Sequence, residues 1–301
     1  MERAIKFLHK YQLIFFFLFT FLIAWSFQLP GAFAALGFGL GENMRITPPD
    51  SPLNLIALWA PGISAIIILL LLQEADELKT MFRRGFSFNV GWRWWLVAFI
   101  TPVIIPVVSY LIYLPLEPLY EIVPFAHTID HVSFEGLPSR ILRDLPIISM
   151  FAIPGAIGEE LGWRSYFQVH LDEKFALVVA GSITGAIWGL WHLPVWLEHG
   201  GLELNVLLLF LATVKIGVFY AWFFQKVNGS LMPFILLYLM TEITGRVVGH
   251  VPYIEPAIWI MIVLAIHFLD HQEPLVDEEA REKMRERIER GREIREKMRA
   301  D

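Results

Sequence analysis

Eight long apolar segments recur along this chain, and they limit the class of fold that it can adopt. They lie at about residues 13–29, 53–72, 92–114, 141–170, 175–196, 204–224, 231–248 and 253–269. A helix needs about 20 predominantly apolar residues to cross the hydrocarbon core of a bilayer. The sequence therefore predicts an all-α fold, a polytopic transmembrane helical bundle of about eight spans.

The composition agrees with a membrane protein and excludes several kinds of chemistry. Of the 301 residues 56% are hydrophobic and only 18% are charged, whereas soluble domains carry more charge. There is no cysteine, which excludes disulfides, thiolate nucleophiles and cysteine metal sites. The net charge of −6 gives no indication of nucleic-acid binding. The expected partner is the lipid bilayer, with no nucleic acid.

Basic residues predict how the chain is oriented in the cell membrane. They cluster in residues 1–10 and again in 74–93, and cytoplasmic loops carry an excess of lysine and arginine. The run at 13–29 is long and more spans follow it, so we expect a membrane helix rather than a cleaved signal peptide. Both termini are predicted to be cytoplasmic.

The last part of the chain has a different character. Residues 277–301 are rich in charges of both signs, with Glu279/Lys283 and Glu286/Arg290 spaced i,i+4. Such pairs support a solvated helix. We expect two parts, a membrane domain over residues 1–270 and a charged, helical cytoplasmic tail over 271–301.

Two adjacent glutamates interrupt the apolar run of residues 147–161. Glu159 and Glu160 are followed by Arg164. Ionisable residues at membrane depth are costly, and they usually face a bundle interior or a wet cavity. On a helix Glu160 and Arg164 share a face, while Glu159 points about 100° away from Glu160. The arginine is therefore expected to pair with Glu160 as a structural strut, which leaves Glu159 as a candidate general base.

Glycines four residues apart mark smooth helix faces. Gly181, Gly185 and Gly189 form one such series, and Gly158 and Gly162 form another. Small residues at this spacing let helix backbones approach closely in lipid. Since the connection between the two segments is short, we expect these two faces to pack against each other in an antiparallel pair.

His192 is the second candidate for chemistry. It follows Trp188 by four residues, so the two side chains share a helix face. Taken alone, it would be an interfacial histidine near a helix end. In an antiparallel pair, however, Glu159 and His192 lie at similar depth, where a carboxylate and an imidazole can activate a water molecule. They could equally be metal ligands, so the cofactor is either none or a divalent metal such as zinc.

The glutamate motif resembles a known family. Glu159-Glu160-x-x-x-Arg164 is similar to the first motif of the CPBP family of intramembrane endopeptidases, which includes type II CAAX prenyl endopeptidases and the bacteriocin-processing and Abi-type proteins. The family's second motif is usually Phe-x-x-x-His, and here Trp188-x-x-x-His192 stands in its place.

Further features extend the resemblance over about residues 11–270. The order and spacing of the motifs and the eight-span layout fit the family. The tract at residues 229–233, Gly-Ser-Leu-Met-Pro, looks like the family's entry to its last motif. There the family usually has His-x-x-x-Asn, thought to polarise the scissile carbonyl, whereas this chain has Tyr238 and Glu242. Tyrosine can donate a hydrogen bond, but an ionised glutamate cannot.

The resemblance implies an endopeptidase that cleaves a peptide or a lipidated protein near the membrane surface. Glu159 and His192 would activate water, Glu160 and Arg164 would hold the motif helix, and Tyr238 would be the leading carbonyl-polarising donor, with a protonated Glu242 as a further donor. CAAX-type processing and bacteriocin or immunity-type processing both remain open. The alternative is a catalytically impaired CPBP-fold scaffold or immunity protein, which the altered third motif favours. A transporter would show repeats and broken helices, and none is evident in the sequence.

Overall fold

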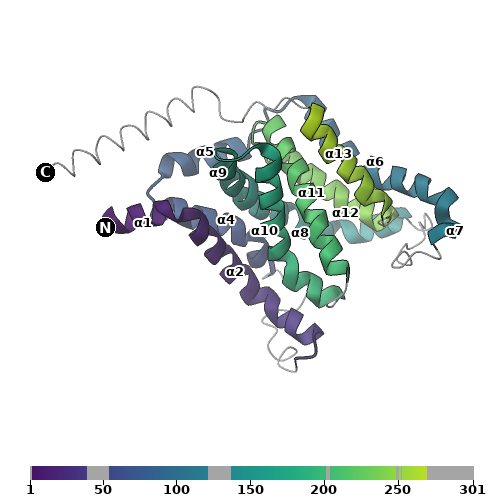
Figure 1. The fold of residues 1–301 in the computed structure, drawn as a ribbon, viewed down its shortest axis with the longest axis horizontal. Helices are drawn as coiled ribbons and strands as arrows, with labels where there is room; N and C mark the ends of the chain where they lie inside the picture. Colours follow the sequence, from purple (N-terminus) through teal and green to yellow (C-terminus); the bar gives the residue numbers. More distant parts are fainter. Residues whose placement is uncertain are drawn as a thin grey trace. The chain divides into compact units, whose positions relative to one another are not determined.

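The computed structural model describes residues 2–38, 54–120, 137–200, 204–248, 251 and 253–269. Within these ranges the chain is helical and contains no β-strand (Figure 1). The all-α fold predicted from the sequence is therefore confirmed. The predicted tail at 271–301 lies outside the described residues.

Each of the eight apolar segments forms a helix or part of one. The elements are α1 Glu2–Lys10, α2 Gln12–Ala35, α4 Asn54–Leu71, α5 Ala75–Gly85, α6 Trp92–Tyr113, η1 Leu114–Leu116, α7 Glu117–Tyr120, α8 Leu137–Gly162, η2 Trp163–Gln168, α9 Val169–Asp172, α10 Leu177–Gly200, α11 Leu204–Lys226, α12 Met232–Val248 and α13 Ile254–Leu269. The fourth predicted span, residues 141–170, thus runs through most of α8 and all of η2 and ends within α9, before Asp172.

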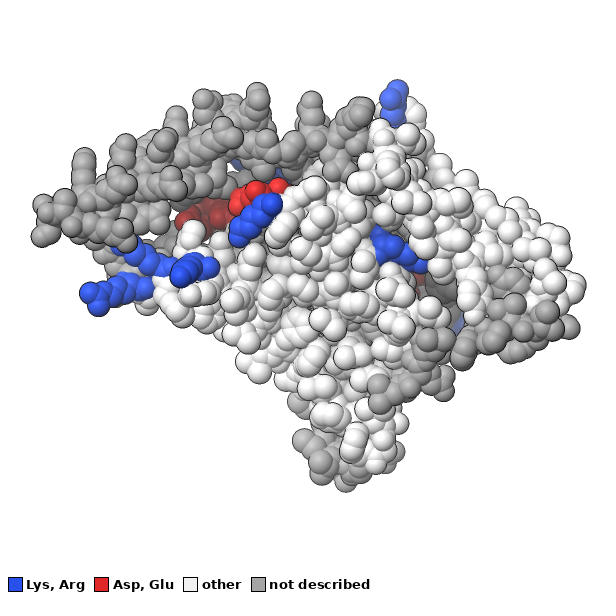
Figure 2. Space-filling model, viewed as in Figure 1, with Lys and Arg blue, Asp and Glu red and all other residues white. Residues whose placement is uncertain are grey.

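The structure supports a multi-pass membrane protein but does not confirm eight spans. Among the described residues, four helices are long and apolar enough to cross a membrane: Gln12–Ala35, Trp92–Leu119, Leu177–Glu198 and Val206–Lys226. Three shorter helices, within α4, α12 and α13, are also apolar. On the face shown in Figure 2, wide areas carry no charged side chain. Helix α8 carries charged residues near both ends and two internal prolines, Pro146 and Pro154, which distinguishes it from the four long apolar helices.

The two glycine faces do not meet each other, so that prediction was wrong. A Cβ added to Gly158 would lie 2.8 Å from the Cα of Trp59 in α4. In the other series, a Cβ on Gly185 would lie 2.8 Å from the Cα of Val214 in α11. The motif helix therefore packs closely on α4, and α10 packs closely on α11. Small residues mark a close approach between backbones, but they do not specify the partner helix.

The segment after the glutamates is a π-helix. All six residues of η2, Trp163–Gln168, are buried. Phe16 of α2 packs against this segment, with its ring 5.5 Å from Trp163 and stacked 5.7 Å from Phe167. Single π-helical turns occur frequently at functional sites. Here the π-helix contains Arg164, one turn after Glu160.

The tract at residues 229–233 fixes the start of α12. The Ser230 hydroxyl donates to the backbone carbonyl of Ser87 at 2.6 Å and accepts from the backbone N–H of Met232 at 3.2 Å. The N–H of Leu231 donates to the carbonyl of Gly85 at 2.8 Å. The serine thus satisfies one of the N–H groups that a helix start leaves open. This anchoring places Tyr238 less than two turns into α12.

Candidate active site

The candidate residues come together from α8, η2, α10 and α12. Helix α8 packs against α12, and α10 contacts η2 (Figure 1). Glu159 and Glu160 lie in the last turn of α8, and Arg164 lies in η2. Trp188 and His192 come from the middle of α10, and Tyr238 comes from α12. The site is therefore enclosed by the bundle rather than built on a loop.

The predicted pair between Glu160 and Arg164 is present. Arg164 Nε lies 3.2 Å from Glu160 Oε2, and both side chains are 0% exposed. The contact is an ion pair without hydrogen-bond geometry, since neither atom has a hydrogen-bond partner among the described residues. The guanidinium also lies over two aromatic rings, 5.2 Å from the centre of Trp188 and 4.9 Å from that of Tyr220. A carboxylate and two ring faces thus surround the buried charge.

Glu159 accepts hydrogen bonds from neutral donors. Its Oε2 accepts from the indole Nε1–H of Trp188 at 2.8 Å and from the Tyr238 hydroxyl at 3.5 Å. It forms no ion pair with any of the described residues. Glu159 is 5% exposed, whereas Glu160 is 0% exposed. The two adjacent glutamates therefore occupy different environments, as the sequence predicted.

The Tyr238 hydroxyl bridges the two carboxylates. Besides its 3.5 Å contact with Glu159, it donates to Glu160 Oε1 at 3.3 Å. A phenol has one proton to donate, so it serves one carboxylate at a time. Glu242 lies one turn further along α12, where its side chain is exposed. The structure thus brings Tyr238 to the glutamates and leaves Glu242 on the outer part of the helix.

His192 lies beside Trp188 in a group of indole rings. Its Nδ1 is 2.9 Å from the backbone carbonyl of Trp188. Its ring meets Trp188 and Trp191 edge to face at 4.9 and 4.6 Å, and it stacks on Trp196 at 5.7 Å. Because a carbonyl can only accept, Nδ1 carries the proton, and Nε2 of the neutral ring keeps a lone pair. Among the described residues, no hydrogen bond or ion pair joins His192 to Glu159; Trp188 contacts both.

Two comparisons with known proteins support the resemblance seen in the sequence. The family model described as type II CAAX prenyl endopeptidase Rce1-like matches residues 142–244. The curated CAAX prenyl protease 2 of Methanococcus maripaludis is 24% identical over 277 residues, which cover 87% of this chain and 95% of that protein. Both matches support the CPBP family. They also support a protease, specifically a membrane endopeptidase.

The matched range contains every candidate site residue of this chain. Residues 142–244 include the following positions: Glu159, Glu160, Arg164, His192, Tyr238 and Glu242. The family match and the buried carboxylate pair therefore fall on the same part of the chain.

The candidate metal ligands are two residues only. Within the ranges that the structure describes, no group of three or more histidine, aspartate or glutamate side chains is arranged to hold a metal ion. Glu159 and His192 supply one oxygen and one nitrogen of the types that zinc accepts. As far as the described residues go, water or substrate would complete the coordination of a zinc ion held by these two side chains.

Sequence reasoning missed two residues of the site. The sequence indicates Trp188 only as an aromatic neighbour of His192. In the structure its indole N–H donates to Glu159 at 2.8 Å, a shorter bond than the one from Tyr238 at 3.5 Å. The signal was present, because tryptophan stands where the family usually has phenylalanine, and only tryptophan has a ring N–H. Tyr220 of α11 covers the Arg164 guanidinium. No pattern in the sequence identified it.

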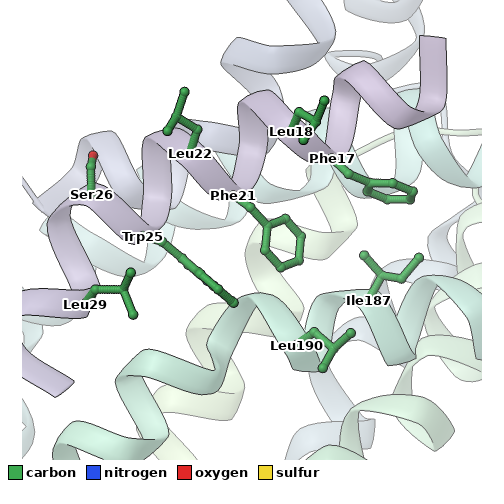
Figure 3. A pocket seen from close by; sticks show the side chains of 9 residues that line it. All are labelled: Phe17, Leu18, Phe21, Leu22, Trp25, Ser26, Leu29, Ile187 and Leu190. Atoms are coloured by element: carbon green, nitrogen blue, oxygen red, sulfur yellow. The ribbon is translucent and has the colours of Figure 1, made fainter. Parts of the chain in front are cut away.

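An apolar cavity of about 670 Å³ lies between α2 and α10 (Figure 3). Phe21 and Trp25 of α2 extend toward α10 in this view. Trp25 also donates its indole N–H to the backbone carbonyl of Trp191 at 3.2 Å, one residue before His192. The cavity is lined by Phe17, Leu18, Phe21, Leu22, Trp25, Ser26, Leu29, Ile187 and Leu190.

Proposed function

We propose that this protein is an intramembrane endopeptidase of the CPBP family in which Glu159 and His192 activate a water molecule. The observation that carries the proposal is the difference between the two glutamates. Glu160 is buried and paired with Arg164, while Glu159, among the described residues, accepts hydrogen bonds from neutral donors only and is 5% exposed. A carboxylate that is not neutralised by a cation retains the ability to take a proton from water.

His192 completes the water-activating pair. Its Nδ1–H is directed to the Trp188 carbonyl, so Nε2 is the nitrogen that accepts a hydrogen bond from water. Glu159 takes the proton as the water oxygen attacks the peptide carbonyl carbon. The same proton then passes to the leaving nitrogen as the C–N bond breaks, which gives a carboxylic acid and an amine.

Tyr238 is our leading candidate for the group that polarises the scissile carbonyl. Its hydroxyl lies at 3.3 and 3.5 Å from the two carboxylates, both long for an O–H···O bond. The proton is therefore free to turn toward a substrate oxygen as negative charge develops there. Glu242, exposed on the next turn, could donate only when protonated.

For the substrate we propose a peptide or protein that carries a lipid chain near its C-terminus. The support is the name of the matched family, a CAAX prenyl endopeptidase, together with the apolar cavity between α2 and α10. A lipid chain in that cavity would lie next to α10, the helix that carries His192. We place both termini and residues 74–93 on the cytoplasmic side, since basic residues favour that side.

One observation favours a second function. Tyr238 and Glu242 stand where the family usually has histidine and asparagine, so a scaffold or immunity protein that has lost catalysis would keep the same fold. The two functions differ in a single measurable property, the turnover of a peptide bond that depends on Glu159.

The test uses purified full-length protein in liposomes and a fluorogenic farnesylated peptide that ends in a CAAX sequence. We expect Glu159→Gln and His192→Ala each to abolish cleavage. The double variant should lose little more than either single one, because residues that act as a unit are non-additive. Glu173→Gln, which changes an exposed glutamate in the α9–α10 connection, is the matched control and should cleave normally.

The same assay distinguishes the alternatives. Cleavage by Glu159→Gln at the wild-type rate would refute Glu159 as the base, whereas no cleavage by the wild type would end the enzyme proposal and favour the scaffold. A chelator separates the two forms of the mechanism. If Glu159 and His192 hold zinc, 1,10-phenanthroline should stop cleavage and added zinc should restore it; water activation by the two side chains alone predicts no effect.

A further inference from the structure

The indole of Trp188 contacts Glu159, Arg164 and His192. Its Nε1–H donates to Glu159 Oε2 at 2.8 Å. Its ring lies under the Arg164 guanidinium at 5.2 Å and meets the His192 ring edge to face at 4.9 Å. Trp188 is 8% exposed, so these contacts fix its orientation in a buried setting.

These contacts form a closed set, called the loop below, that runs from Glu160 through Arg164 and Trp188 to Glu159 and back to Glu160 along the backbone. Glu160 pairs with Arg164 at 3.2 Å, and Arg164 lies over the Trp188 ring. Trp188 then donates to Glu159, the residue next to Glu160. A phenylalanine at position 188 would keep the ring face for Arg164, but it would break the loop, because it has no N–H to donate.

The loop also distinguishes the two oxygens of Glu159. Both hydrogen bonds that Glu159 makes within the described residues are accepted by Oε2. Charge-assisted hydrogen bonds of this kind are short and directional. The Trp188 bond therefore fixes the carboxylate rotation, and Oε1 is the oxygen left to take a proton from water.

We propose that Trp188 is a positioning residue that links the Glu160–Arg164 pair to Glu159 and presents Oε1 of Glu159 to the water. This inference rests on the proposed function of Glu159 as the base. It explains why the departure from phenylalanine in the second motif matters for this chain. The indole replaces a purely apolar neighbour by one that orients the carboxylate.

The kinetic test compares Trp188→Phe with Trp191→Phe on the farnesylated peptide. Trp191 is a suitable control because it lies on the same helix, is buried, and also packs against His192. Its indole N–H has no hydrogen-bond partner among the described residues. Trp188→Phe should lower kcat about 10- to 100-fold, the range for losing a hydrogen bond to a charged group, with KM unchanged. Trp191→Phe should leave both constants near wild type.

A second measurement does not depend on activity. In protein labelled with ¹⁵N-tryptophan, the indole N–H resonance that disappears in Trp188→Phe is assigned to Trp188. We expect it downfield of the Trp191 resonance, as a donor to a carboxylate should be, and we expect Glu159→Gln to move it upfield. Arg164→Lys, which alters the stacked guanidinium, should move it as well, because the loop joins the two.

The outcomes separate this inference from the proposed function. If the wild type cleaves no peptide, the proposed function fails and the resonance still tests the loop. If the wild type cleaves and Trp188→Phe keeps its kcat, the positioning role is refuted while the enzyme remains. Equal losses in Trp188→Phe and Trp191→Phe, or a Trp188 resonance unaffected by Glu159→Gln, would also overturn the inference.

Discussion

Replacing Glu160 by alanine should destabilise the protein far more than replacing Glu159 by glutamine. Arg164 is 0% exposed, and Glu160 is the carboxylate with which it pairs among the described residues. Without Glu160 the guanidinium keeps its ring contacts with Trp188 and Tyr220 but loses the one carboxylate with which it forms an ion pair among the described residues. Breaking a buried ion pair by removing one partner costs about 3–5 kcal/mol. The hydrogen bond from Tyr238 to Glu160 is lost as well.

Glu159→Gln provides the contrast. Glutamine keeps a side-chain oxygen that accepts from Trp188, and no cation is paired with Glu159 among the described residues. We expect its stability to stay close to wild type. A third variant, Glu160→Leu with Arg164→Met, removes both charges and keeps similar volume. Since replacing a whole buried pair by apolar residues is often neutral or stabilising, this double variant should be more stable than Glu160→Ala alone.

The assay is thermal unfolding of detergent-solubilised protein at neutral pH, followed by tryptophan fluorescence. At 2–4 °C per kcal/mol, a loss of 3–5 kcal/mol lowers the midpoint by about 6–20 °C. Unfolding half-lives at one fixed temperature serve where the transition is irreversible. Equal destabilisation by Glu160→Ala and Glu159→Gln would refute the distinction between strut and base. The distinction would also be refuted if the double variant Glu160→Leu with Arg164→Met were less stable than Glu160→Ala.

Three other predictions concern Tyr238, the end of α9 and the orientation in the membrane. Tyr238→Phe should lower kcat by about 10²–10³-fold, the loss seen for one oxyanion donor, and cleavage at the wild-type rate would exclude the hydroxyl. Burial raises the pKa of Asp172 to about 6, opposed by hydrogen bonds from Gln168 and Gln225. Because the pKa of Asp172 is higher in the folded than in the unfolded protein, the free energy of unfolding falls as pH rises from about 4 to about 6. Asp172→Asn should remove this fall, which is measured as a drop in the thermal midpoint. Identical pH profiles of the midpoint in wild type and variant would contradict the prediction. Reporter fusions after Arg84 and Asp301 should both report the cytoplasm, and an external reporter after Asp301 would disprove the eight-span orientation.

The positions of the helices follow from local sequence. Each of the eight apolar runs became a helix or part of one, because a lipid-exposed backbone must satisfy its own hydrogen bonds. The number of membrane crossings stays a prediction, since only four described helices are both long and apolar enough to cross. The Glu160–Arg164 pair was also predictable. Residues one turn apart on a helix are neighbours whatever the rest of the fold does.

The contacts between helices were not predictable in the same way. Gly158 was expected to face α10 but packs on α4 beside Trp59. In lipid, apolar faces are equivalent in hydrophobicity, so close packing rather than burial selects the partner. Trp188 was read as a neighbour of His192, and its bond to Glu159 crosses from α10 to α8, 29 residues away along the chain.

The sequence alone determined an all-helical membrane protein with a glutamate pair, one member of which is held by Arg164, because both results depend on hydrophobicity and helix periodicity within one segment. The tertiary structure decided which groups face Glu159. It placed the Trp188 indole and the Tyr238 hydroxyl on one carboxylate oxygen and left the Glu242 side chain exposed. Those contacts join three helices, and their geometry depends on how α8, α10 and α12 pack, which no single helix encodes.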